Sequence, residues 1–219
     1  MENGTQNAVH SRNKVDDIMD KTFRQALMLR RSYYELSAIS TLSDKEIEEL
    51  LAFAVKYVPS AFNSQSTRMV LLLHEAHAKM WNIVKETLRG IVPPEAFGRT
   101  EKKIDTSFAS GYGTVLFFED GEVVERLQRE FPTYAATFPA WADQTSAMHQ
   151  LTVWTLLEEA GMGASLQHYN PLIDKRVHET WHLPEHWRLI AQMPFGKALD
   201  TPSGKEFKPV DERLFVFER

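Results

Sequence analysis

The spacing of hydrophobic positions changes along the chain, and these changes predict its main elements. Apolar residues recur at helical spacing over residues 15–30, 75–88 and 144–160. Continuous apolar runs, which are typical of buried strands, occupy residues 69–73, 114–118, 189–193 and 214–217. Helices therefore separate most of the expected strands.

Two local signals define the ends of predicted helices. Ser43 followed three positions later by Glu46 is a capping box, and it predicts a helix that continues to Pro59. Gly161 follows the longest apolar helix and is expected to end it.

The elements predict one α+β domain over residues 13–219, with a central sheet between helices. The polar residues 1–12 carry little hydrophobic pattern, and we expect a flexible tail there. The chain contains no internal repeat and no low-complexity linker.

Composition narrows the class of protein. A net charge of −5 leaves no basic surplus for phosphates, so no nucleic-acid partner is expected. The absence of cysteine excludes disulfides, thiolate catalysis and cysteine-bound metals. No apolar run approaches the roughly 20 residues of a membrane span. The first twenty residues lack the apolar core of a secretory signal, and a cytoplasmic protein is expected.

The first predicted helix ends in Arg30, Arg31 and Ser32. Two guanidinium groups and a hydroxyl could clamp a phosphate, because the arginine fork matches its oxygens. Taken alone, these residues favour a solvated helix end, where positive charge is stabilised.

A polar loop at residues 59–68 lies between a predicted helix and a predicted strand. Its Asn63 and Gln65 amides carry both donors and acceptors, which suits the edge of a heterocycle. The alternative is a turn whose Ser, Asn and Pro residues satisfy their own backbone.

The segment 161–171, with sequence GMGASLQHYNP, crowds small and polar residues beside an aromatic one. Such a segment brings backbone close to a buried surface on which a flat group can lie. We interpret that group as a flavin.

Two further segments have competing interpretations. Residues 131–141, rich in proline and aromatic residues, form either a mobile wall for flat substrates or a loop packed on the core. The sequence His178-Glu179-Thr180-Trp181-His182 matches the zinc-peptidase pattern H-E-x-x-H. Pro184 interrupts the helix before His186, so a solvated helix face is favoured over zinc, and no metal is expected.

Together these segments resemble the FMN-dependent nitroreductase family. The resemblance rests on Arg30-Arg31-Ser32, on the Pro-Ser-x-x-Asn-x-Gln loop at 59–65, and on 161–171. Finer agreement is with a short subgroup related to fatty-acid-repression mutant proteins and copper-induced nitroreductases. Its motifs are FPxY at 131–134, FPxW at 138–141, LQHYNP at 166–171 and AQMPFG at 191–196.

The resemblance implies an α+β homodimer with a central mixed sheet and tightly bound, non-covalent FMN at the subunit interface. It assigns the phosphate and ribityl chain to Arg30, Arg31, Ser32 and Lys205. It assigns the isoalloxazine ring to Pro59, Ser60, Asn63, Gln65, Ser66, Ser165, Leu166 and Gln167, some of them from the partner. The expected substrate pocket contains Tyr134, Phe138 and His168.

The implied reaction is ping-pong. NADH or NADPH delivers hydride to the flavin and leaves, and a nitroaromatic or quinone then takes its place. No side chain is expected to act as an acid, base or nucleophile, because the flavin performs the chemistry. The alternative is a flavin-binding regulatory or stress-response protein whose turnover is incidental.

Overall fold

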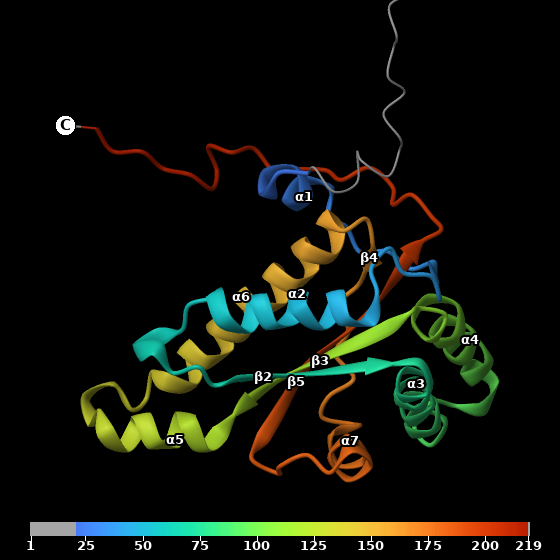
Figure 1. Ribbon diagram of the computed structural model, residues 1–219, viewed down its shortest axis with the longest axis horizontal. Coiled ribbons are helices and arrows are strands. Elements are labelled where there is room, and N and C mark those ends of the chain that lie inside the picture. Colours follow the sequence, from blue (N-terminus) through green and yellow to red (C-terminus); the bar gives the residue numbers. More distant parts are fainter. Residues whose placement is uncertain (1–20, 219) are drawn as a thin grey trace, which may run out of the picture.

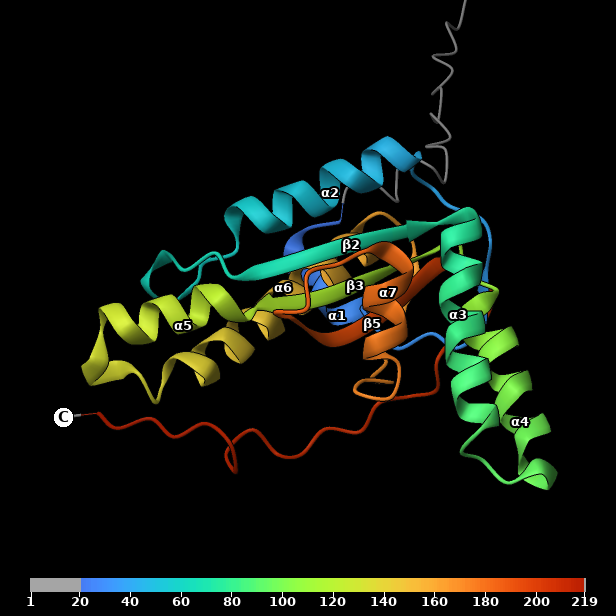
Figure 2. The same ribbon diagram turned by 90° about the horizontal axis from the view of Figure 1, so that it is seen from below.

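The computed structural model describes residues 21–218 and places a sheet between two layers of helices (Figures 1 and 2). The helices are α1 (Phe23–Leu29), α2 (Asp44–Tyr57), α3 (His74–Arg89), α4 (Pro94–Ile104), α5 (Gly121–Glu130), α6 (Phe138–Glu159) and α7 (Asp174–Trp181). The strands are β1 (Leu36–Ser37), β2 (Thr67–Leu73), β3 (Gly113–Asp120), β4 (Gly163–Ala164) and β5 (Trp187–Ala198). Short 3-10 turns η1 (Ala61–Asn63) and η3 (Pro132–Tyr134) and a π-helical turn η2 (Asp105–Ala109) complete the described elements.

All strand pairs among the described residues are antiparallel, whereas the resemblance implied a mixed sheet. The order is β1-β5-β3-β2, and the short strand β4 also pairs with β5. In the central register Phe117 of β3 lies opposite Met69 of β2 and Ala191 of β5. The sequence prediction of a central sheet between helices is therefore confirmed.

Alternate residues of β3 enter opposite cores, as the two-residue period of a strand requires. Val115 and Phe117 pack under α2 and α6, whereas Leu116 and Phe118 face α3, α4 and α7. All four side chains are fully buried. Such a strand reads as an unbroken apolar run, because helices cover both of its faces.

The predicted helix ends are confirmed in atomic detail. Ser43 caps α2, and its side chain and that of Glu46 each bond the other's backbone N–H. Gly161 has a φ of 78°. Its N–H donates to the carbonyl of Glu158, and the N–H of Met162 donates to that of Leu157. This Schellman arrangement ends α6 and turns the chain into β4.

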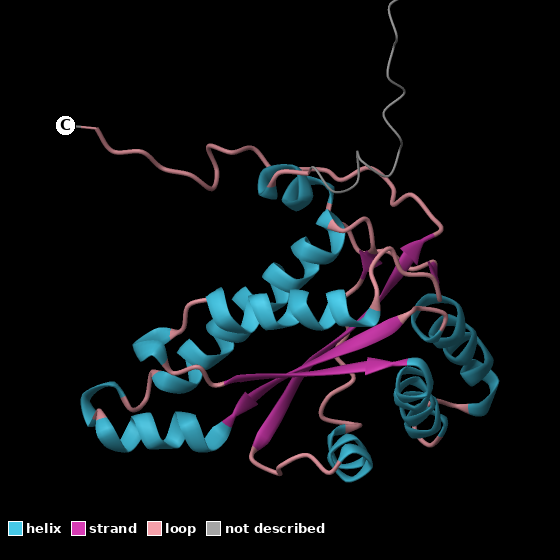
Figure 3. Ribbon diagram, viewed as in Figure 1, coloured by secondary structure: helices cyan, strands magenta, loops and turns pink. Residues whose placement is uncertain are grey.

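Some boundaries and one strand differ from the sequence prediction. The predicted strand at 214–217 is wrong: these residues are exposed and irregular, and Figure 3 shows the chain beyond β5 as loop. A strand needs a partner, and the described chain offers none there. Helices α4 and α5 were not predicted, and α6 begins at Phe138 rather than at residue 144. The predicted tail and residues 15–20 of the first predicted helix lie outside the described residues. Within the described range α1 begins at Phe23, after the N-cap Thr22, and not before residue 21 as predicted.

Candidate functional site

The sequence-predicted phosphate residues meet in one pocket. Helix α1 ends at Leu29, and the N–H of Arg30 donates to the carbonyl of Ala26. The chain then lays Arg30, Arg31 and Ser32 along an open pocket of about 500 Å³, opposite Lys205 from the segment after β5. Arg31 is held there by a 2.8 Å hydrogen bond from its guanidinium to the carbonyl of Ser203.

The pocket gathers positive charge from Arg30, Arg31 and Lys205. Among residues 21–218, no carboxylate oxygen lies within 4.0 Å of the charged nitrogens of Arg30, Arg31 or Lys205. Asp200 lines the pocket without pairing with them. Burial, and then the charge of Arg31, lower the pKa of Arg30, and the charge of Glu158 partly offsets this effect. An anion in the pocket would favour the charged form of Arg30 further. Three cations beside a serine hydroxyl fit a phosphate group.

A tryptophan that the sequence analysis did not select supports this pocket. The Arg30 guanidinium lies over the Trp154 ring, 4.3 Å from its centroid. Neither the Arg30 Nε nor the Trp154 Nε1 has a hydrogen-bond partner within the described chain. In the sequence, Trp154 is part of an apolar helix pattern, which predicts an ordinary core residue. Only its contact with Arg30 in the structure connects it to the pocket.

The predicted flavin segment at 165–167 lies next to the pocket that contains Ser32. Ser32 forms a parallel bridge with Ala164, and the Tyr33 N–H donates to the Ala164 carbonyl at 3.0 Å. The N–H groups of Ser165 and Gln167 both donate toward β5, to Pro194 and Gln192. Because N–H groups alternate along an extended chain, that of Leu166 points away from β5. Its N–H finds no acceptor among residues 21–218.

The predicted isoalloxazine loop at 59–66 has a tightly wound backbone. Phe62, Asn63 and Gln65 have φ values of 56°, 49° and 49°, in the left-handed region that favours glycine. The Ser60 hydroxyl accepts the Gln65 N–H at 3.0 Å. The amide side chains of Asn63 and Gln65 are exposed and make no hydrogen bond within the described chain. Ser66 differs, because it is fully buried and its hydroxyl donates to Glu119.

The loop and the phosphate pocket contact different parts of α6. Arg30 lies over Trp154, whereas Phe62 of the loop packs on Phe138 and Trp141. At a helical rise of about 1.5 Å per residue, Trp141 and Trp154 are about 20 Å apart along the axis. The two groups of predicted residues therefore do not form one pocket within a single chain.

The predicted substrate residues have three different environments. Phe138 is buried against Val123 and Leu127 of α5, so it packs on the core. Tyr134 is 46% exposed, and its ring lies 5.7 Å from that of Phe62. His168 is exposed beyond the 165–167 segment. Within residues 131–141, Phe138 packs on the core, whereas Phe131 and Tyr134 are partly exposed; a mobile wall for substrates stays a prediction.

The histidine motif does not form a metal site in this fold. Helix α7 ends at Trp181, and His182 has left-handed backbone, with φ 51°. Both ring nitrogens of His178 lie within hydrogen-bond distance of carbonyl oxygens, those of Asp174 at 2.8 Å and Trp187 at 2.7 Å. Over residues 21–218 no three His, Asp or Glu side chains are grouped closely enough to hold a metal ion. The zinc alternative therefore has no geometric support.

Comparison with known proteins defines the class. The sequence pattern of the nitroreductase family matches residues 27–197. Putative nitroreductase HBN1 of Saccharomyces cerevisiae is 36% identical over 198 residues, which cover 89% of this chain and 97% of that protein. Nitroreductase FRM2 of the same yeast is 32% identical over 187 residues, or 84% of this chain and 92% of that protein. The chain therefore belongs to the nitroreductase family, whose members are oxidoreductases.

Solved structures agree with this assignment. Nitroreductase CinD from Lactococcus lactis, in a complex with chloramphenicol, superimposes with a TM-score of 0.82 at 38% identity. The match covers 90% of this chain and all of that one. The same enzyme with 4-nitrophenol gives a TM-score of 0.81 at 39% identity and equal coverage. As for membranes, none of the helices in the described range is long and apolar enough to cross one.

Proposed function

We propose that this protein is an FMN-dependent NAD(P)H oxidoreductase that reduces nitroaromatics or quinones by a ping-pong mechanism. The observation that carries the proposal is the meeting of Arg30, Arg31, Ser32 and Lys205 in one cationic pocket beside the segment 163–167. A flavin that carries a phosphate fits both the cationic pocket and the segment 163–167. Its phosphate would bind the cations, and its flat ring would lie against the backbone of the segment.

The residues have separate tasks in this proposal. Arg30, Arg31 and Lys205 bind the phosphate, and the Ser32 hydroxyl bonds the phosphate or the ribityl chain. The Leu166 N–H, which points away from β5, would donate to the flavin ring. FMN bound there would supply the hydride-transfer chemistry between NADH or NADPH and the oxidant. A fixed N–H beside the ring would tune that chemistry without a proton-transferring side chain.

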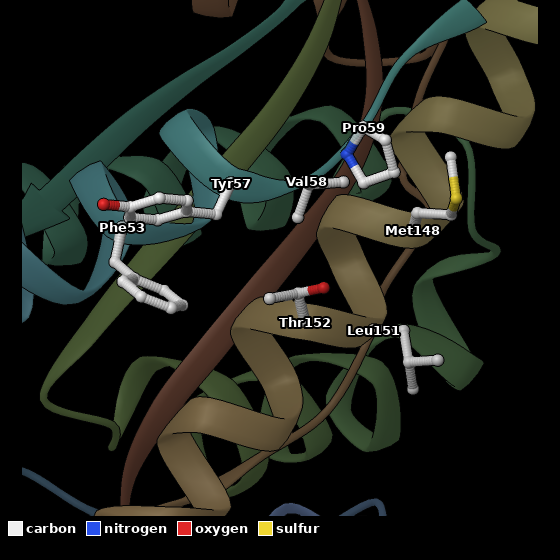
Figure 4. A pocket seen from close by; sticks show the side chains of 7 residues that line it. All are labelled: Phe53, Tyr57, Val58, Pro59, Met148, Leu151 and Thr152. Carbon is white, nitrogen blue, oxygen red and sulfur yellow. The ribbon is translucent and has the colours of Figure 1, made fainter.

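The isoalloxazine loop reaches the cofactor from a second copy of the chain. One chain holds its loop about 20 Å along α6 from its own phosphate pocket, so one subunit does not complete the site. An apolar groove between α2 and α6 continues from this loop. Figure 4 shows its lining: Phe53, Tyr57, Val58, Pro59, Met148, Leu151 and Thr152. Pro59 belongs to both features, and we propose that a second copy covers the groove.

The substrate class follows from the aromatic rings near the loop. Phe62 and Tyr134 are each about half exposed, and such rings bind flat aromatic molecules by stacking. The related CinD structures contain chloramphenicol and 4-nitrophenol, both nitroaromatic compounds. We therefore propose nitroaromatics and quinones as oxidants, which stack where the nicotinamide ring has lain.

An anaerobic absorbance experiment tests this function. Purified protein should show the flavin bands, lose them when NADH or NADPH is added, and regain them with 4-nitrophenol or a quinone. A protein that binds no flavin would overturn the proposal. Flavin bands that neither nicotinamide nucleotide can bleach would support the regulatory alternative.

A further inference from the structure

A buried carboxylate lies directly beneath the isoalloxazine loop. Glu119 is 2% exposed near the end of β3. Its two carboxylate oxygens accept hydrogen bonds from neighbouring hydroxyls, Ser66 Oγ at 2.6 Å and Thr67 Oγ1 at 2.5 Å. Burial raises the pKa of Glu119, and the two hydroxyl bonds partly offset that effect. A carboxylate in so dry a place is costly, which suggests a specific role.

The loop above Glu119 needs external support. Phe62, Asn63 and Gln65 all have left-handed backbone. Side chains with a Cβ adopt that conformation rarely, and it persists only where the surroundings impose it. Within the loop, the Gln65 N–H donates to the Ser60 hydroxyl. The Phe62 ring packs on Phe138 and Trp141 of α6. The base of the loop at residues 65–68 supplies further support.

The base of the loop is tied to the end of β3 by several bonds. The Asp120 N–H donates to the Ser66 carbonyl at 2.9 Å. Arg68 donates to the Gln65 carbonyl at 2.7 Å and to the Asp120 carboxylate at 2.8 Å. Glu119 completes this base, because it fixes the side chains of Ser66 and Thr67 from below.

We infer that Glu119 is a positioning residue for the cofactor ring: its bonds to Ser66 and Thr67 hold the strained loop so that the Asn63 and Gln65 amides face the isoalloxazine. This inference rests on the proposed function. A carboxylate is suited to this task because both of its oxygens accept, whereas the glutamine amide has one acceptor oxygen and an NH2 group that only donates. Glu119→Gln therefore keeps the shape of the side chain. It requires either the Ser66 or the Thr67 hydroxyl to accept a hydrogen bond instead of donating one.

Riboflavin, which lacks the phosphate, separates a ring defect from a phosphate defect. The affinities of the apoprotein for FMN and for riboflavin are measured by quenching of flavin fluorescence. Glu119→Gln should weaken both ligands by the same factor, about tenfold, and shift the visible spectrum of the bound flavin. Ser66→Ala should behave similarly, and the double variant should lose less than the product of the two factors.

A matched control removes a comparable carboxylate elsewhere. Asp174→Asn changes a partly buried carboxylate on α7, whose pKa burial also raises, on the opposite side of the sheet. It should leave riboflavin affinity unchanged. If Glu119→Gln does not fold, judged by circular dichroism, Ser66→Ala and Thr67→Val decide the question instead.

The outcomes separate the inference from the proposed function. Unchanged riboflavin affinity and spectrum in Glu119→Gln would overturn the inference, and so would a loss confined to FMN. A wild-type protein that binds neither flavin would instead overturn the proposed function.

Discussion

The guanidinium carbon of Arg30 lies 4.3 Å from the centroid of the Trp154 ring. This contact joins the end of α1 to α6 and holds at the candidate phosphate pocket a cation that forms no ion pair within residues 21–218. An aromatic face orients a guanidinium and leaves its charge available, whereas a carboxylate would neutralise it. In the proposed function, Trp154 therefore positions Arg30 to bind an anion.

Replacing Trp154 by leucine tests whether its contact with Arg30 supports phosphate binding. Loss of the ring should weaken FMN binding about fivefold, which corresponds to a cation–π contribution of about 1 kcal/mol. The measurement is a fluorescence titration of apoprotein with FMN. Trp181→Leu, at the end of α7, serves as the control and should bind FMN normally. Wild-type affinity in Trp154→Leu would show that the stacking has no role in binding.

The phosphate assignment predicts a strong effect of charge removal. Arg30→Ala combined with Lys205→Ala should yield mostly apoprotein, because two of the three cations of the pocket are lost. Riboflavin affinity should change little. A control of equal charge is Arg129→Ala with Lys175→Ala, two side chains on exposed helix surfaces. Unchanged FMN content, read from absorbance after purification, would contradict the assignment.

The subunit interface is tested in the groove of Figure 4. Leu151 is 44% exposed on α6, and Leu151→Glu places a charge on the proposed contact surface. The variant should be monomeric and should lose FMN, since the partner's loop no longer completes the site. Light scattering gives the mass. Ile91→Glu, at an exposed apolar residue between α3 and α4, should leave both properties intact. A wild-type monomer that retains flavin would refute the proposal.

We expect the free energy of unfolding to decrease as the pH is lowered, because His77 is buried. His77 is 3% exposed, and burial lowers its pKa below the ordinary value of 6.5. Below that value the unfolded chain binds a proton that the folded chain resists, so the free energy of unfolding decreases as pH falls. His149 shifts in the same direction for the same reason.

Urea denaturation at pH 7.5 and pH 5.5 measures this dependence. His77→Gln should lose stability at pH 7.5, because the ring bonds Thr114 and Ala109. It should nevertheless show a smaller pH dependence than the wild type. The exposed His182→Gln provides the comparison and should keep the full slope. An equal slope in His77→Gln would mean that His77 is not the source.

The capping box of α2 should contribute measurably to the free energy of unfolding. Ser43→Ala removes the acceptor of the Glu46 N–H and should cost about 1 kcal/mol of stability. For a chain of this size the melting temperature should fall by about 2–4 °C. Ser43→Asp retains a capping oxygen and should melt near the wild type. Equal melting of Ser43→Ala and wild type would indicate that α2 does not need its cap.

Several features could be predicted from neighbouring residues alone. The Ser43–Glu46 box, the Gly161 stop and the buried runs in β2, β3 and β5 all appear as expected. Each depends on side chains within a few positions of one another. The motifs at 166–171 and 191–196 likewise indicated the family, because they combine unusual residues in a fixed order.

Other features depend on where distant segments meet. In the sequence, Glu119 appears only as a polar residue at the end of a strand. The tertiary structure is needed to show that the Ser66 and Thr67 hydroxyls donate hydrogen bonds to it. The apolar residues 214–217 were mistaken for a strand, because their pattern matches one while no described neighbour pairs with them.

By itself the sequence determined the family, the local elements and the residue types that suit a phosphate and a flat ring. The tertiary structure alone decided which of these residues meet: it joined Arg30 to Lys205 and placed the 59–66 loop far along α6. The physical reason is that short-range spacing governs helix and strand formation, whereas a binding site depends on contacts between segments that are remote in sequence.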